Sequence, residues 1–199
     1  MIQFLTNYSD AEQSKLESMV ELCLDAGVDC IQFSWNRDDV LYRLENIKKL
    51  TDKYNALLCI NNNIALAEKF DADYIHIGPT DASVKEIKKR LPNIKIGFSI
   101  HPFYKLEELD YNVDYFGVGP VYKTITFKGH NKTFGLNKFK ELVLNAKQPI
   151  CAIGGINDET IKLIKETRCE DICISGHFYR SLDTLKTIQN VVKYWNETD

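Results

Sequence analysis

The stretch Pro149-Ile-Cys-Ala-Ile-Gly-Gly-Ile-Asn-Asp158 combines an apolar run, a glycine pair and the start of a helix. Residues 150–153 are continuously apolar, which is typical of a parallel strand that is covered on both faces. The pair Gly154-Gly155 allows a sharp turn and a close approach of the backbone to a ligand. Asn157 or Asp158 is suited to cap the helix that follows. This order of elements predicts a βα unit whose loop binds an anion such as a phosphate.

A second unit of the same kind follows directly. Residues 171–174 predict another strand, Ser175-Gly176 another turn, and residues 182–195 the next helix. A (β/α)8 barrel builds its phosphate site from the loops after strands 7 and 8. Two ordinary tight turns are the alternative, and the pairing of the two turns favours anion binding.

Apolar strands and amphipathic helices alternate along the whole chain. The expected strands cover residues 1–6, 30–33, 56–60, 74–77, 95–99, 115–118, 150–153 and 171–174. A capping box at residues 9–12 begins the first helix, Gly27 ends it, and a short helix is expected around Leu106 and Leu109. We therefore predict an α/β fold, a minimal (β/α)8 TIM barrel that forms a single domain over residues 1–199.

The even-numbered strands share a pattern that supports a barrel. An aspartate stands just before or at the first residue of each of these strands, and a small residue follows each strand; the aspartates are Asp29, Asp73, Asp114 and Asp171. Such a repeat indicates that alternate strands supply equivalent layers of the barrel interior.

Composition narrows the class of protein. The chain is 44% hydrophobic and 27% charged with a net charge of −3, so we expect a soluble protein without a nucleic-acid or membrane surface. The amino-terminal residues lack the pattern of a signal peptide, which favours the cytoplasm. Cys30, Cys59, Cys151 and Cys173 fall in apolar strands, so free buried thiols are expected, and no cysteine spacing indicates zinc.

Polar and mostly neutral side chains follow the expected strands, where a barrel carries its functional residues. They are Gln32, Ser34, Asn36, Asn61, Asn62, Asn63, Asp81, Ser99, His101, Thr124 and Thr126. Each also has a structural interpretation, because these residue types cap helices and form turns. Asp81 is suited to cap the fourth helix, and His76 to be a hydrogen-bonded residue of the barrel interior.

Taken together, these positions resemble the thiamine-phosphate synthase and thiazole tautomerase (TenI-like) family. The resemblance covers nearly the whole chain and rests on Gln32, Ile60-Asn-Asn-Asn-Ile-Ala-Leu-Ala67, Ala72-Asp-Tyr-Ile-His-Ile-Gly-Pro-Thr-Asp81, Ile96-Gly-Phe-Ser-Ile-His101, Asp114-Tyr-Phe-Gly-Val-Gly-Pro-Val121, Thr124-Ile-Thr126 and Ala152-Ile-Gly-Gly-Ile156. It implies a transferase that joins an aminopyrimidine methyl pyrophosphate to a thiazole phosphate and releases pyrophosphate with Mg²⁺.

The resemblance also implies roles for individual residues. Asp81, Asn61 and Ser99 would be catalytic, and Asp81 and Asn62 would face the metal. The substrate-binding set would be Gln32, Asn36, His76, Thr124, Thr126, Gly154, Gly155, Ser175 and Gly176. The expected partner is a small phosphorylated substrate, and a homo-oligomer is left open.

The sequence departs from the family pattern mainly where pyrophosphate would bind. Ser34 and Asn36 replace an expected Arg and Lys, and Asn62 replaces a second metal-binding Asp. Phe127 stands where a Lys is expected, with Lys128 one position later, and the tautomerase branch would have a His at Pro120. The cations left to compensate are Arg37, Lys123, Lys128 and Lys132.

These departures define the functional hypotheses. We expect a synthase reaction with a diverged pyrophosphate site and with weak, ligand-dependent Mg²⁺ binding. The alternatives are a different, TenI-like reaction on an aromatic phosphate and a non-catalytic protein that binds a phosphorylated ligand.

Overall fold

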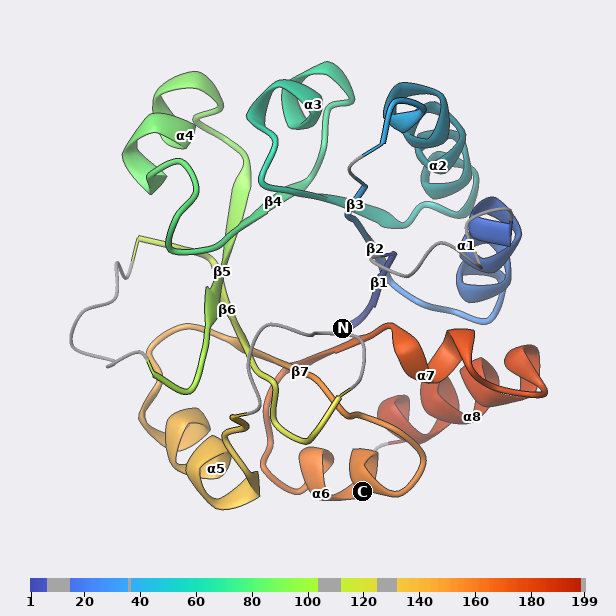
Figure 1. Ribbon diagram of the computed structural model, residues 1–199, viewed down its shortest axis with the longest axis vertical. Helices are drawn as coiled ribbons and strands as arrows, with labels where there is room; N and C mark the ends of the chain where they lie inside the picture. Colours follow the sequence, from blue (N-terminus) through green and yellow to red (C-terminus); the bar gives the residue numbers. More distant parts are fainter. Residues whose placement is uncertain (7–14, 36, 104–111, 125–131, 198–199) are drawn as a thin grey trace.

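Eight parallel strands close into a barrel in the order of the sequence (Figure 1). The computed structural model describes residues 1–6, 15–35, 37–103, 112–124 and 132–197. The strands are β1 (Ile2–Leu5), β2 (Cys30–Phe33), β3 (Leu57–Asn61), β4 (Tyr74–Ile77), β5 (Lys95–Ile100), β6 (Tyr115–Val118), β7 (Ile150–Ile153) and β8 (Asp171–Ile174). This confirms the predicted (β/α)8 barrel.

Helices form a ring around the barrel (Figure 1). They are α1 (Leu16–Asp25), α2 (Val40–Tyr54), α3 (Ile64–Lys69), α4 (Val84–Arg90), α5 (Leu136–Asn145), α6 (Thr160–Lys165), α7 (Gly176–Tyr179) and α8 (Thr184–Asn196). The predicted capping box at residues 9–12 and the predicted helix around Leu106 and Leu109 lie outside the described residues.

The chain after β8 differs from the prediction. The sequence predicts one helix over residues 182–195, whereas the structure has the four-residue α7 and then α8. Gly176 begins α7 and is buried, and Asp183 caps α8 by accepting the N–H of Lys186. A helix of a single turn is too short to show an apolar periodicity, which is why the pattern did not reveal it.

The two faces of the barrel strands have different chemistry. Outward-facing residues such as Phe4, Ile31 and Phe116 belong to a large apolar cluster together with the helices. The barrel interior instead contains a separate small cluster in which Tyr115, Cys151 and Cys173 are buried. Polar side chains are therefore carried inside the barrel by alternate positions of each strand.

The repeated acid before the even-numbered strands has a structural role. A carboxylate accepts a backbone N–H at the start of the preceding strand in four places: Asp29 from Ile2, Asp73 from Leu58, Asp114 from Ile96 and Glu170 from Ile150. At β8 the residue is Glu170 and not the predicted Asp171, which pairs with the terminal ammonium of Met1 at 2.7 Å. These bonds join neighbouring strands at the amino end of the barrel, opposite the expected site.

All six cysteines are free and buried, as predicted for the four that lie in strands. Burial raises the pKa of each of these four strand thiols, that of Cys59 to about 12. Among the described helices, none is long and apolar enough to cross a lipid bilayer.

Candidate functional site

A cavity of about 870 Å³ opens at the carboxyl ends of the strands. Its lining includes every described residue to which the resemblance gives a role: Gln32, Asn61, Asn62, His76, Asp81, Ser99, Thr124, Gly154, Gly155, Ser175 and Gly176. Of the other polar residues expected at strand ends, His101 lines the cavity, whereas Ser34 and Asn63 do not, and Asn63 caps α3. The other two predicted site residues, Asn36 and Thr126, lie outside the described residues. The barrel thus brings residues from most of its strands to one cavity.

Two amide side chains form one side of the cavity. Gln32, on β2, is buried, and its Nε2 donates to Asn61 Oδ1, at the end of β3, over 2.7 Å. The Cys173 thiol donates to Gln32 Oε1 at 3.6 Å, which fixes the orientation of that amide. Asn61 accepts from Gln32 through Oδ1, so its Nδ2 group is the donor end of a side chain that lines the cavity.

A histidine links the barrel interior to the cavity. His76 Nδ1 lies 2.8 Å from the hydroxyl of Tyr115, and His76 Nε2 lies 2.8 Å from Ser99 Oγ. Burial, with a smaller contribution from His101, lowers the pKa of His76 to about 4, so the imidazole is neutral near pH 7. His76 is therefore a hydrogen-bonded barrel residue, as expected, and it also lines the cavity, while its role in substrate binding stays a prediction.

Asp81 lies in the loop after β4 and does not cap α4. Its Oδ2 accepts the N–H of Gly78 at 2.6 Å, and its Oδ1 accepts from Asn62 Nδ2 at 3.2 Å. Ser83 caps α4 in a capping box with Glu86. The capping alternative for Asp81 is therefore wrong, and the carboxylate belongs to the cavity.

The Asp81 carboxylate is suited to a weakly held Mg²⁺, whereas the atom of Asn62 that faces it is the amide Nδ2, a donor. Mg²⁺ prefers oxygen ligands and commonly takes one or two carboxylates together with substrate phosphates. Within the described ranges, no group of three or more His, Cys, Asp or Glu side chains could hold a metal ion. One carboxylate beside one amide suits an ion that a diphosphate brings with it, since the phosphates supply the missing charge.

Both positions of the pair Gly154-Gly155 after β7 require glycine, because of their backbone conformation and because of their packing. Gly154 has φ +94° and Gly155 φ +70°, conformations that other residues rarely adopt. A Cβ on Gly154 would lie 2.5 Å from the Cβ of Pro120, and one on Gly155 would lie 2.6 Å from the Cβ of Tyr122. The turn is thus packed against the loop after β6. Gly176 is not among the glycines with positive φ, so the second turn is not a copy of the first.

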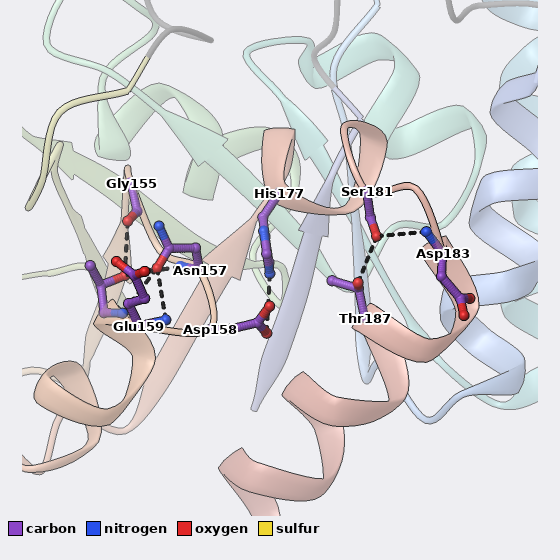
Figure 2. A network of polar contacts seen from close by, with 9 residues as sticks. Gly155, Asn157, Asp158, Glu159, His177, Ser181, Asp183 and Thr187 are labelled. Atoms are coloured by element: carbon purple, nitrogen blue, oxygen red, sulfur yellow. Dashed lines mark hydrogen bonds and ion pairs between the residues drawn. The ribbon is translucent and has the colours of Figure 1, made fainter.

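Side chains beyond this turn hold its shape (Figure 2). Asn157 Oδ1 accepts the backbone N–H groups of Glu159 and Thr160, each at 3.0 Å, and so orders the turn before α6, whose N-terminal capping residue is Glu159 and not the predicted Asn157. The Thr160 hydroxyl donates to the Gly155 carbonyl at 2.9 Å. Asp158, the other candidate cap, instead faces His177, with Oδ1 and Nε2 3.3 Å apart.

Among the residues that the structure describes, two cationic side chains line the cavity, both on the side of β6 to β8. Lys123 was named from the sequence, whereas Arg180, just after α7, was not. Arg37 and Lys132 are exposed and do not line the cavity, and Lys128 lies outside the described residues. Asp158, His177 and Tyr115 also line it and were missed. A cation soon after the eighth strand was the available signal for Arg180.

Comparison with known proteins gives consistent matches. The family described as thiamine monophosphate synthase matches residues 2–178. The chain is 32% identical to thiamine-phosphate synthase of Methanococcus maripaludis over 94% of this chain and 89% of that one. It is 30% identical to the Streptococcus suis enzyme of the same name over 96% and 87%. Thiamine phosphate pyrophosphorylase from Pyrococcus furiosus superposes with a TM-score of 0.82 at 26% identity, over 96% and 93% of the two chains.

Proposed function

Because the chain belongs to the thiamine monophosphate synthase family, as the resemblance predicted, we propose that it joins an aminopyrimidine methyl diphosphate to a thiazole phosphate and releases pyrophosphate. The supporting observation is that one cavity carries the amide pair Gln32 and Asn61, the Asp81 carboxylate and the Gly154-Gly155 turn. The diphosphate substrate and the monophosphate substrate can therefore bind in the same cavity.

The pyrimidine would bind over the interior end of the cavity. Gln32, Asn61 and Ser99 present amide and hydroxyl groups there, which suit the ring nitrogens and the amino group of an aminopyrimidine. Neutral groups are appropriate because the pyrimidine ring becomes cationic when its methylene carbon loses the diphosphate. A nearby positive side chain would oppose that charge.

The thiazole phosphate would bind at the β7 and β8 side. Backbone N–H groups of the Gly154-Gly155 turn and of Ser175-Gly176 would bind the phosphate, with Lys123 and Arg180 as the nearby cations. Thr124 and Thr126 would line the ring. The thiazole nitrogen then forms the new C–N bond to the methylene carbon as the C–O bond to the diphosphate breaks.

Mg²⁺ would be held by Asp81 together with the diphosphate, and by Asn62 once its amide has turned its oxygen toward the ion. The charge of the ion would stabilise the leaving group. The protein contributes one carboxylate to this site and no lysine or arginine that the structure places beside it. We therefore propose a diverged pyrophosphate site that works more slowly than one with a full set of cations.

A direct assay tests this proposal. The protein is incubated with the aminopyrimidine methyl diphosphate, the thiazole phosphate and Mg²⁺, and pyrophosphate and the joined product are quantified. We expect product that depends on Mg²⁺ and is lost in Asp81→Asn, while Asp71→Asn, a change in an exposed loop at the other end of the barrel, has no effect. Absence of product in the wild type would contradict the proposal.

The same samples separate the alternatives. If thiazole phosphate raises the melting temperature but no pyrophosphate appears, the protein is a binder or acts on a different aromatic phosphate. Conversion of the thiazole phosphate alone, without the pyrimidine, would identify a TenI-like reaction.

A further inference from the structure

Two hydroxyl groups compete for one imidazole in the barrel interior. A neutral imidazole has one N–H and one lone pair, so His76 can donate to only one of Tyr115 and Ser99 and must accept from the other. The choice determines whether Ser99 offers a proton or a lone pair to the cavity. The phenol of Tyr115 is more acidic than the aliphatic hydroxyl of Ser99, so Tyr115 is the stronger donor to the lone pair of the His76 imidazole.

We propose that Tyr115 is a positioning residue that fixes His76 in the Nε2–H tautomer and thereby makes Ser99 a hydrogen-bond donor toward the substrate. Tyr115 O–H donates to His76 Nδ1, His76 Nε2–H donates to Ser99 Oγ, and the Ser99 proton is then free to point into the cavity. This inference rests on the proposed function only for the identity of the substrate.

The barrel provides space for this chain of contacts at two glycines. A Cβ on Gly97 would lie 2.2 Å from the ring of Tyr115, and a Cβ on Gly117 would lie 2.8 Å from His76 Cε1. Any larger residue at either position would displace one of the two rings. The rings lie in contact, with centroids 5.6 Å apart.

The resulting polarity of the cavity restricts the ligand. Ser99 and the Nδ2 group of Asn61 are both donors, so the group bound between β3 and β5 should carry acceptors. A pyrimidine ring nitrogen is such an acceptor. Substrates that offer only N–H donors on this edge would leave both groups unsatisfied.

The tautomer is measured by ¹⁵N NMR of the histidine side chains, with His76→Gln used to assign the signal. In the wild type we expect an unprotonated Nδ1 and a protonated Nε2. Tyr115→Phe should remove this preference, whereas Tyr74→Phe should keep it. Tyr74 is the matched control because its ring packs against Tyr115 at 5.9 Å, and its hydroxyl accepts from Lys95 instead.

Ser99→Ala provides a test that does not disturb the barrel interior. If Tyr115 is the donor, removal of the serine leaves the Nε2–H tautomer in place. A switch to the Nδ1–H tautomer in Ser99→Ala would show that acceptance by Ser99, and not donation by Tyr115, had set the tautomer. That result would overturn the proposal, as would Nδ1–H in the wild type.

Binding of the aminopyrimidine methyl diphosphate, measured by calorimetry, gives the functional readout. We expect Tyr115→Phe to weaken binding about fivefold in a protein that has Ser99, and to have no effect in the Ser99→Ala background. Equal losses in both backgrounds would show a structural role only and overturn the proposal. The NMR result stands without turnover, so a failure of the synthase assay and a failure of this inference are distinguishable.

Discussion

The charge of a single side chain, Asn62, decides how strongly the cavity can attract a divalent cation. Its backbone has φ +60°, a conformation that Asn and Asp both tolerate. Its amide nitrogen lies 3.2 Å from Asp81 Oδ1, so an Asp at this position would place a second carboxylate beside the first. Without a metal, the two charges would repel each other.

We therefore predict that Asn62→Asp increases Mg²⁺ affinity about tenfold or more when inorganic pyrophosphate is present, because Mg²⁺ affinity follows the number of charged oxygen ligands. Titration calorimetry with Mg²⁺ and pyrophosphate measures the change. Asn93→Asp, at the opposite end of the barrel, is the control for added charge. Equal Mg²⁺ affinity in the two variants would show that residue 62 does not face the metal.

His76 gives the protein a defined dependence of stability on pH. Its pKa is lowered by burial from 6.5 to about 4, so between these values the unfolded chain binds a proton that the folded protein does not. The contribution of His76 to stability is therefore complete above pH 6.5 and is lost as the pH falls toward 4. Over this range the loss is about 3 kcal/mol.

Urea unfolding of the wild type and of His76→Asn between pH 7 and pH 4 tests this prediction. The variant should be less stable at pH 7 but should lose less free energy of unfolding on acidification. Carboxylates titrate in both proteins, so the difference between the two curves isolates His76. Parallel curves would show that the histidine is already protonated or exposed.

Sequence reasoning at the residue scale found polar groups at strand ends but not the groups behind them. Asn61 and Ser99 lie at the carboxyl ends of β3 and β5, and Asp81 lies in the loop after β4, so their position alone indicated the cavity. Tyr115 lies at the start of β6 and its role depends on Gly97 in the neighbouring strand, a contact that no local pattern encodes. The role of Asp81 was ambiguous for a different reason, because a helix cap and a site residue have the same sequence signature.

At the scale of elements, the strands were predicted well because their outward faces must be apolar to pack against helices. The predicted limits of β2, β4, β6, β7 and β8 agree with the structure at both ends. The short α7 was missed because one turn carries too few residues for a periodicity. The repeated Asp before the even-numbered strands was recognised from the sequence. Its structural role, a hydrogen bond to the preceding strand, could not be predicted without knowing how the barrel strands are aligned.

This hydrogen bond leads to a prediction for β3 and β4. Asp73 Oδ2 accepts the N–H of Leu58 at 2.8 Å, so Asp73→Ala should lower the free energy of unfolding by about 1 kcal/mol. Chemical denaturation measures the loss. Asp71→Asn, in the same loop at a residue with φ +47°, should change stability little, because Asn tolerates that conformation. A similar loss in both variants would indicate a general effect of charge on this loop.

At the scale of the whole molecule, the cavity is electrostatically asymmetric. The Asp81 carboxylate lies on the β3 and β4 side, without a lining Lys or Arg among the described residues there. The β6 to β8 side carries the cations Lys123 and Arg180 together with the Asp158 carboxylate, which faces His177. The net charge of −3 gives no general attraction for phosphates, so local groups must select them. A phosphate monoester should therefore prefer the glycine turn, whereas a diphosphate needs a metal.

The asymmetry predicts that the loss of one lysine weakens the binding of one ligand and leaves that of the other nearly unchanged. Lys123→Gln should weaken binding of the thiazole phosphate about tenfold, because a charge-assisted contact in the cavity is lost. Binding of Mg²⁺ with pyrophosphate should change little, since that pair is held on the Asp81 side. Lys132→Gln is the matched control, because Lys132 is exposed and does not line the cavity. Thermal shift and calorimetry with each ligand alone measure both effects. If Lys123→Gln instead weakened pyrophosphate binding and spared the thiazole phosphate, Lys123 would be the cation that replaces those missing from the pyrophosphate site.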